Sequence, residues 1–219
     1  KNEDGVVENT DKMFASVGVG DKEYKLLAKV SDFTKDGWKL EALRNENATL
    51  VPGGKLEKDA FLTNKDGRKI GVIIRNLSDK NQKVSDCIVT KLSFSKEMFD
   101  GQITLPGSLG FDSTEKELKA AGFKKDADGI YTYTSKKIKD DTIKAAMADG
   151  ESVSEITLER AVDESSTSTG NAAANTSVST AAGSATTTAS DSSSAEQNSA
   201  TADTTLTNNS NSASDAAEE

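Results

Sequence analysis

The feature that most constrains this chain is a break in composition at Ser165, after which few residues could contribute to a hydrophobic core. Of the last 55 residues, 38 are Ser, Thr or Ala, and the larger aliphatic residues are limited to Val178 and Leu206. A segment this poor in apolar side chains cannot offset the conformational entropy lost on folding. We therefore expect residues 165–219 to be a disordered, Ser/Thr/Ala-rich tail, acidic because it carries six acids and no basic residue.

The sequence before Ser165 predicts a polar leader followed by a folded body. Residues 1–12 are mostly polar, and strand-like patterns begin at Met13. We expect a first α+β half over residues 13–100 and a second over residues 101–164. The chain starts at Lys1 with neither an initiator Met nor a signal peptide, so we expect a processed or trimmed form.

Composition excludes several common kinds of site. The chain has no His and one Cys, which excludes Ser-His-Asp triads, Cys-His dyads, His-liganded zinc, intrachain disulfides and Cys-rich metal sites. The net charge of −9 argues against general nucleic-acid binding. No run of about 20 apolar residues is present to cross a membrane. We expect a protein that is not an enzyme, has no cofactor and no metal, and binds no nucleic acid.

Alternation of apolar and polar residues predicts that strands dominate the body. Short runs at 13–19 and 23–27 flank a turn at Gly20-Asp21. The run 69–77 is the most apolar and is predicted to be a central strand. In the next run, 84–94, strict alternation places Ile88, Thr90, Leu92 and Phe94 on one face and Cys87, Val89 and Lys91 on the other.

Glycines mark the predicted turns and helix ends. Asp-Gly pairs, a strong hairpin signal, begin at positions 66, 100, 128 and 149. Residues 113–122 predict a helix with Ser113 as its N-cap and Gly122 at its C-terminal end. Residues 31–37 predict a shorter helix. Residues 142–158 are ambiguous, because propensity favours a helix near 144–148, but the Asp-Gly pair favours a hairpin, which we predict.

Two stretches of the body look alike. Each has a strand, a short capped helix, a Gly followed by an aromatic residue (Gly37-Trp38 and Gly122-Phe123) and then several strands. We therefore expect an α+β fold of two similar halves, each with a short helix packed on an antiparallel sheet. Chance similarity is the rival explanation.

The second stretch also resembles a known module. The segment Ser113-Thr114-Glu115-x-Glu117-Leu118-x-x-x-Gly122-Phe123, with three strands predicted after it, resembles the tandem module of the beta-lactamase-inhibitor-protein-like fold, which occurs in small bacterial envelope lipoproteins. Residues 13–160 together resemble uncharacterised lipoproteins secreted by Gram-positive gut bacteria. The resemblance implies a noncatalytic, extracytoplasmic protein anchored by an N-terminal lipidated Cys, which this chain lacks. The tail departs from the pattern, because the spacer in such proteins usually lies near the N-terminus.

Three aromatic residues are the candidate binding residues. Tyr131 and Tyr133 lie two positions apart, so they share one face of a predicted strand. They would either pack within the sheet or form an exposed platform for a protein or a glycan. Trp38 has the same two interpretations, as a core anchor or as a ligand contact.

Other residues with reactive or ligating chemistry fit structural roles. Cys87 is expected to be a small buried hydrophobic residue, because no His is present to activate it. The segment Asp126-x-Asp128-Gly129 resembles part of a calcium loop, but Lys137 occupies the position that requires Glu, so we predict a hairpin turn. Asp140-Asp141 is predicted to be a solvated turn. Asn76-Leu77-Ser78 matches an N-glycosylation acceptor, a triplet that is common by chance.

These patterns lead to one expected function and two alternatives. We expect a cell-surface binding or structural module that contacts a protein or a cell-wall component and reaches the membrane only through a lipid anchor. The first alternative is an inhibitor or regulator of another enzyme, acting through a rigid loop at Pro52-Gly53-Gly54 or Leu105-Pro106-Gly107. The second is a carboxylate hydrolase, which needs a deep pocket with two facing acids. Acids such as Glu57 and Asp59 instead lie beside lysines in predicted turns.

Overall fold

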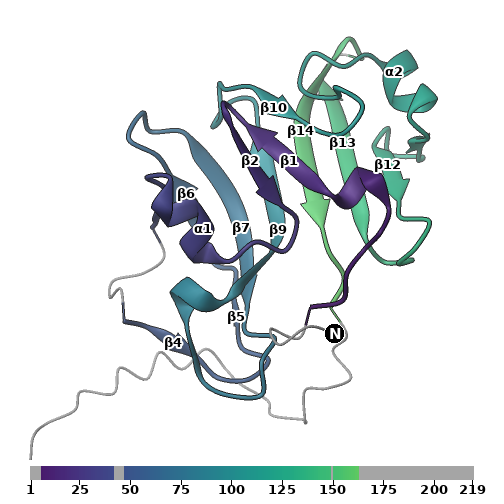
Figure 1. Cartoon of the computed structure of the whole chain (residues 1–219). Coiled ribbons are helices and arrows are strands. Elements are labelled where there is room, and N and C mark those ends of the chain that lie inside the picture. Colours follow the sequence, from purple (N-terminus) through teal and green to yellow (C-terminus); the bar gives the residue numbers. More distant parts are fainter. Residues whose placement is uncertain (1–5, 42–46, 149, 163–219) are drawn as a thin grey trace, which may run out of the picture. The chain divides into compact units, whose positions relative to one another are not determined.

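The computed structural model describes residues 6–41, 47–148 and 150–162, which form an α+β fold built mostly from antiparallel strands (Figure 1). This confirms the predicted α+β class. The tail predicted over 165–219 lies outside the described residues. The described helices are two short α-helices and two single 3₁₀ turns: α1 (Val30–Lys35), α2 (Glu115–Ala120), η1 (Lys12–Phe14) and η2 (Val84–Asp86).

The described strands belong to three antiparallel sheets. The largest has nine strands. Eight of them lie side by side in the order β11 (Lys124–Lys125), β12 (Tyr131–Thr134), β13 (Thr142–Ala148), β14 (Ser152–Glu159), β9 (Ile88–Ser95), β7 (Lys69–Arg75), β6 (Phe61–Thr63), β3 (Lys39–Leu40). The ninth, β5 (Lys55–Leu56), pairs with β7 beside this main path. A three-stranded sheet has the order β10 (Ile103–Thr104), β1 (Ser16–Val19), β2 (Lys22–Lys25). A small ribbon pairs β4 (Thr49–Leu50) with β8 (Gln82–Lys83).

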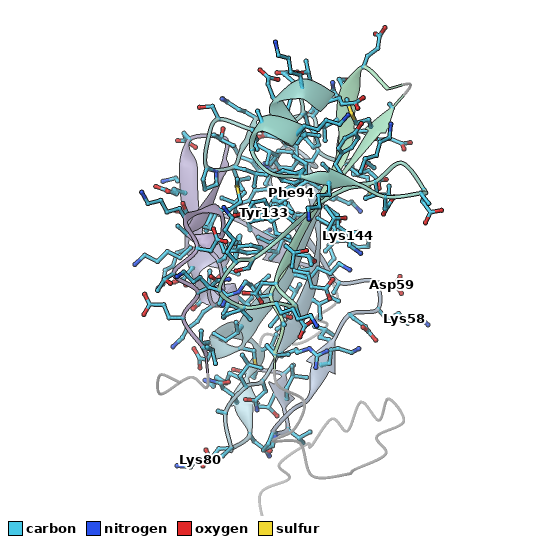
Figure 2. All side chains as sticks on the ribbon, turned by 90° about the vertical axis from the view of Figure 1, so that its right-hand side faces the viewer. Lys58, Asp59, Lys80, Phe94, Tyr133 and Lys144 are labelled. Carbon is cyan, nitrogen blue, oxygen red and sulfur yellow. The ribbon has the colours of Figure 1, made fainter. Side chains whose placement is uncertain are left out.

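One face of the nine-stranded sheet carries the core, and no described helix or strand covers the other, which we call the open face. Along β7, Ile70, Val72 and Ile74 are buried, whereas Gly71 and Ile73 lie half-buried on the opposite face. The buried face shares one hydrophobic cluster with β1, β2 and α1. In Figure 2 the purple strands β1 and β2 lie on one side of the sheet, and Lys144 points out on the other. The open face is therefore free to carry a site.

The strand predicted over 84–94 differs from strict alternation at Thr90. Ile73 pairs with Lys91 and Ile74 with Val89, so Thr90 is an extra residue that forms a β-bulge. The bulge reverses the alternation, and Val89 joins Leu92 in the core instead of facing away from it. The predicted face assignment is therefore right beyond the bulge and wrong before it. The first part of the predicted run is the 3₁₀ turn η2 rather than strand.

Most predicted turns and helices are confirmed. The ambiguous segment is the hairpin of β13 and β14, and Gly150 has a positive φ of 76°. The helix expected near 113–122 is α2, but Thr114, not Ser113, is its N-cap. Thr114 and Glu117 form a capping box, while the Ser113 hydroxyl accepts a hydrogen bond from the Gly110 amide at 2.9 Å. The run expected to be strand from Met13 begins with the 3₁₀ turn η1.

The polar leader does more than precede the first strand. Asn9 is buried and donates from Nδ2 to Ser135 Oγ at 3.0 Å and to Asp141 Oδ2 at 2.6 Å. The Arg160 guanidinium pairs with Asp141 and donates to the Val7 carbonyl at 2.8 Å. We call this group the Asp141 clasp. The prediction of a solvated turn at Asp141 is wrong, because its carboxylate is fully buried and accepts three hydrogen bonds.

Candidate functional site

The three aromatic residues singled out from the sequence are buried. Tyr131, Tyr133 and Trp38 are 1%, 6% and 7% exposed, respectively. The expectation of an exposed aromatic platform is therefore wrong, and the alternative of packing within the sheet and core is confirmed. Every other aromatic side chain is also buried except Phe61, which is partly exposed. No patch of exposed aromatic side chains forms among residues 6–41, 47–148 and 150–162.

Polar partners within the body explain why the aromatic residues face inward. The Tyr133 hydroxyl donates to the Asp11 carboxylate at 3.1 Å, and burial together with this carboxylate raises the pKa of Tyr133. The Trp38 indole donates to the Tyr24 hydroxyl at 3.1 Å. The Tyr131 ring lies 5.3 Å from the Lys125 ammonium, and its buried hydroxyl has no hydrogen-bond partner among the described residues. The polar groups of Tyr133 and Trp38 are therefore occupied by the fold.

A residue outside the predicted site, Asn76, holds two surface loops of the described body in a fixed arrangement. Asn76 follows β7, is 0% exposed, and uses all of its hydrogen-bonding groups. Its side-chain amide donates to the Leu50 carbonyl at 2.8 Å and to the Lys80 carbonyl at 2.7 Å. Its side-chain oxygen accepts from the Ser78 amide at 2.9 Å and the Ser78 hydroxyl at 2.7 Å. One side chain thereby fixes two loops.

The backbone of Asn76 holds the first of these loops as well. The Gly53 amide donates to the Asn76 carbonyl, and the Asn76 amide donates to the Gly54 carbonyl, both at 3.0 Å. Gly53 has a positive φ of 69°, which glycine adopts at little cost. A Cβ at Gly54 would lie 2.8 Å from the Val51 carbonyl oxygen, so the turn also requires glycine there. We call residues 50–54 and 76–80 together the Asn76 loop pair.

The tip of the Asn76 loop pair presents an apolar residue to solvent. Val51 is 57% exposed, and Pro52 beside it is also exposed. Lys80, at the tip of the second loop, extends from the end of the molecule in Figure 2. The other predicted loop differs, because Leu105 and Leu109 pair with each other and are buried. Of the two loops predicted from the sequence, 52–54 is thus the one with an exposed apolar neighbour.

The open face of the large sheet contains a hollow of about 290 Å³. Its floor is Gly71 of β7 and Ser93 of β9, and its walls include Phe61, Ile73 and Lys91. Glu57 and Asp59 stand on its rim, in the segment between β5 and β6. We call this feature the Gly71 hollow. It lies just below the about 300–1,000 Å³ of typical small-molecule sites, so it is suited to a single side chain or a small group.

A general acid of a carboxylate hydrolase needs a raised pKa. The acids with shifted pKa values in the described part of the chain all shift downward, and none of them lines the hollow: Asp11, Glu41, Asp100, Glu115, Glu117. At the hollow itself, Glu57 pairs with Lys55 at 2.7 Å and Lys91 with Glu159 at 3.3 Å. The lining therefore presents charged groups that are partly engaged in ion pairs.

Cys87 has the structural role expected from the sequence. It is fully buried, and its thiol contacts the Lys83 carbonyl oxygen at 3.3 Å. Burial, with a smaller contribution from the charge of Asp86, raises the pKa of the Cys87 thiol to about 12. A thiol held in this state is a poor nucleophile at neutral pH.

The calcium-like segment forms the predicted turn. The Asp126 side chain accepts from the Asp128 amide at 3.0 Å and from the Ile130 amide at 2.9 Å, which closes the connection between β11 and β12. Within the described ranges, no cluster of three or more Cys, Asp or Glu side chains is arranged to hold a metal ion. None of the helices in those ranges is both long and apolar enough to span a bilayer.

Sequence reasoning identified the loop at 52–54 but missed the residue that organises it. Asn76 attracted notice only as an N-glycosylation acceptor, and its buried, fully bonded amide is incompatible with modification of the folded chain. A usable signal was its position, as a polar residue directly after the most apolar strand. Comparison with known proteins gives no match to a protein-family model, a curated protein or a solved structure.

Proposed function

We propose that this chain is a noncatalytic binding module that contacts another protein through the Asn76 loop pair. The observation that carries the proposal is the group of six hydrogen bonds by which buried Asn76 fixes both loops beneath exposed Val51. A contact loop that is already rigid loses less conformational entropy on binding, which raises affinity.

We place the module outside the cytoplasm, attached to a Gram-positive cell surface by an N-terminal lipid. The support is the resemblance of residues 13–160 to secreted lipoproteins. The coding sequence upstream of Lys1 tests the location. A signal peptide ending in a small-residue box and Cys would support it, and a cytosolic start would refute it.

We further propose that the body consists of two similar halves. From the outer edge toward the centre, the strands after α2 run β11, β12, β13, β14. Those after α1 on the main path of the sheet run β3, β6, β7, β9, with β5 added beside β7 and β4 and β8 in a separate ribbon. Each series starts just after a Gly-aromatic pair that follows a helix. The two series meet where β14 pairs antiparallel with β9. This order supports duplication of a helix followed by a meander.

Photo-crosslinking tests the proposed contact surface. A benzophenone amino acid is placed at Val51 or, as a matched control, at Met98, which is 42% exposed and also apolar. We expect a discrete adduct on intact source cells from position 51 and not from position 98. Adding Asn76→Ala should reduce the adduct at least tenfold, because the loop loses its fixed shape. Equal adducts from both positions, or none from position 51, would refute the proposal.

An enzyme inhibitor is the second candidate function. The specific observation in its favour is that the loop at 52–54 is rigid, exposed and bordered by an apolar side chain. If the cross-linked partner is an enzyme, its turnover is measured with a molar excess of this protein. If the protein lowers turnover and the Val51→Asp variant does not, the result supports an enzyme inhibitor that acts through this loop. Unchanged turnover would leave a binding module without inhibitory activity.

A further inference from the structure

We propose that the Gly71 hollow receives the side chain of a lysine or arginine from the polypeptide that the module binds. The inference deepens the proposed function and rests on it for the identity of the partner as a protein. The hollow is a shallow depression on the open sheet face, lined by residues of β6, β7 and β9. Shape and charge both point to a basic residue.

The shape of the hollow suits a long, unbranched stem. Gly71 leaves its floor without a side chain, and the neighbour across the ladder is the small residue Ser93. The Phe61 ring and Ile73 provide apolar walls against which methylene groups can pack.

The charge at the rim favours a cation. Lys91 is neutralised by Glu159 at 3.3 Å, and Glu57 by Lys55 at 2.7 Å. The Asp59 carboxylate, by contrast, has no ion pair or hydrogen bond within the described residues and is exposed at the rim. Figure 2 shows Lys58 and Asp59 on a loop that stands away from the sheet. An incoming ammonium or guanidinium group would supply the partner that Asp59 lacks.

The hollow lies within reach of the proposed contact surface. Gly71 and Asn76 are five residues apart along the same chain segment, which is roughly 17 Å for extended backbone. The segment that follows the turn at 52–54 is β5, and β5 leads directly to the rim residues Glu57 and Asp59. One extended partner segment of a few residues can therefore contact both features.

The test uses a defined probe rather than the natural partner. Isotope-labelled protein is titrated with Nα-acetyl-lysine methylamide, and amide chemical shifts are followed by NMR. We expect saturable shifts centred on Gly71, Ile73 and Ser93. Nα-acetyl-norleucine methylamide, which has the apolar stem without the charge, should bind at least fivefold more weakly. Equal binding of both probes, or shifts located elsewhere, would overturn the inference.

Two variants and a matched control sharpen the result. Asp59→Asn removes the charge but keeps a residue type that tolerates the positive φ of 52° found there, and it should weaken lysine binding at least fivefold. Lys58→Gln, on the same loop outside the lining, should change it less than twofold. Gly71→Val should abolish binding, because the methyl groups of valine would fill the floor of the hollow. The backbone should tolerate valine, since a Cβ at this position meets only ordinary contacts at 3.4 Å or more.

Folding and function are controlled separately. Thermal unfolding followed by Trp38 fluorescence should show that Gly71→Val remains folded, since valine suits a strand. If it unfolds, Asp59→Asn alone decides the question. The NMR probe requires no natural partner. If it does not bind, the proposed lysine site is refuted, while the cross-linking test of the Asn76 loop pair is unaffected. A lost cross-link with intact probe binding would refute only the proposed function.

Discussion

At the scale of single residues, the described body places its polar chemistry where it shapes backbone. Asn76 and Asp141 are both completely buried, and each binds segments distant in sequence. A buried polar group costs free energy unless all its hydrogen bonds are made. Sequence patterns did not reveal either residue, because a polar residue near Gly, Ser or Asp is typical of solvated turns. What distinguishes them is the set of partners that the fold supplies.

Replacement of Asn76 by Ala should lower the stability of the fold, although Asn76 lies in a loop and not within a strand. The variant leaves the Leu50 and Lys80 carbonyls without their donor, and we expect the free energy of unfolding to fall by about 2–3 kcal/mol. Urea titration followed by Trp38 fluorescence measures this. Asn81→Ala is the matched control, because Asn81 is exposed and should change stability by less than about 0.5 kcal/mol. A loss for Asn76→Ala no larger than for the control would contradict the assignment.

Cys87 should be unreactive in the native state. With a pKa of about 12, roughly one thiol in ten thousand is ionised at pH 8. We expect Ellman's reagent to label the native chain at least a thousandfold more slowly than the chain in denaturant. A Cys87→Ala, Asn81→Cys double variant provides the exposed control and should react at once. Fast labelling of native Cys87 would show that it is accessible.

At the scale of elements, the sequence predicted what local chemistry determines. Asp-Gly turns, the hairpin of β13 and β14, both helices and the interior position of β7 follow from glycine, capping residues and alternation. The bulge at Thr90 was missed because it depends on pairing with β7, not on the residues of β9. Strands of two residues, such as β4 and β8, are too short to show a period and depend on their partner for their existence.

The N-cap of α2 provides a test at this scale. Thr114 accepts from the Glu117 amide at 3.3 Å, and Glu117 accepts from the Thr114 amide at 2.8 Å. Thr114→Ala should lower the free energy of unfolding by about 1 kcal/mol, measured by urea titration. Thr114→Ser keeps the acceptor oxygen and should retain most of the stability. If Ser cost as much as Ala, packing of the threonine methyl group rather than capping would explain the loss.

At the scale of the whole described body, one core joins segments from both ends of the described range. β1 pairs with β10, and β9 with β14, so the boundary expected between residues 100 and 101 is crossed by two sheets. The Asp141 clasp closes the arrangement, because Arg160 binds the Val7 carbonyl and Asp141 binds both Arg160 and Asn9. Hydrophobic patterns gave no sign of this contact, because its members are polar and lie up to 153 positions apart.

The clasp should therefore matter to global stability more than any surface ion pair. Arg160→Met leaves the Asp141 charge buried without its counter-ion, and we expect the free energy of unfolding to fall by about 3–5 kcal/mol. Adding Asp141→Asn should recover part of the loss, because the remaining buried group is then neutral. Arg68→Met is the matched control, since the Arg68 pair with Asp100 at 2.7 Å is exposed and screened by solvent, so its loss should change the urea midpoint little. If the two Arg variants were equally stable, the N-terminal segment would not be bound through this pair, and removing residues 1–10 should then leave the urea midpoint unchanged.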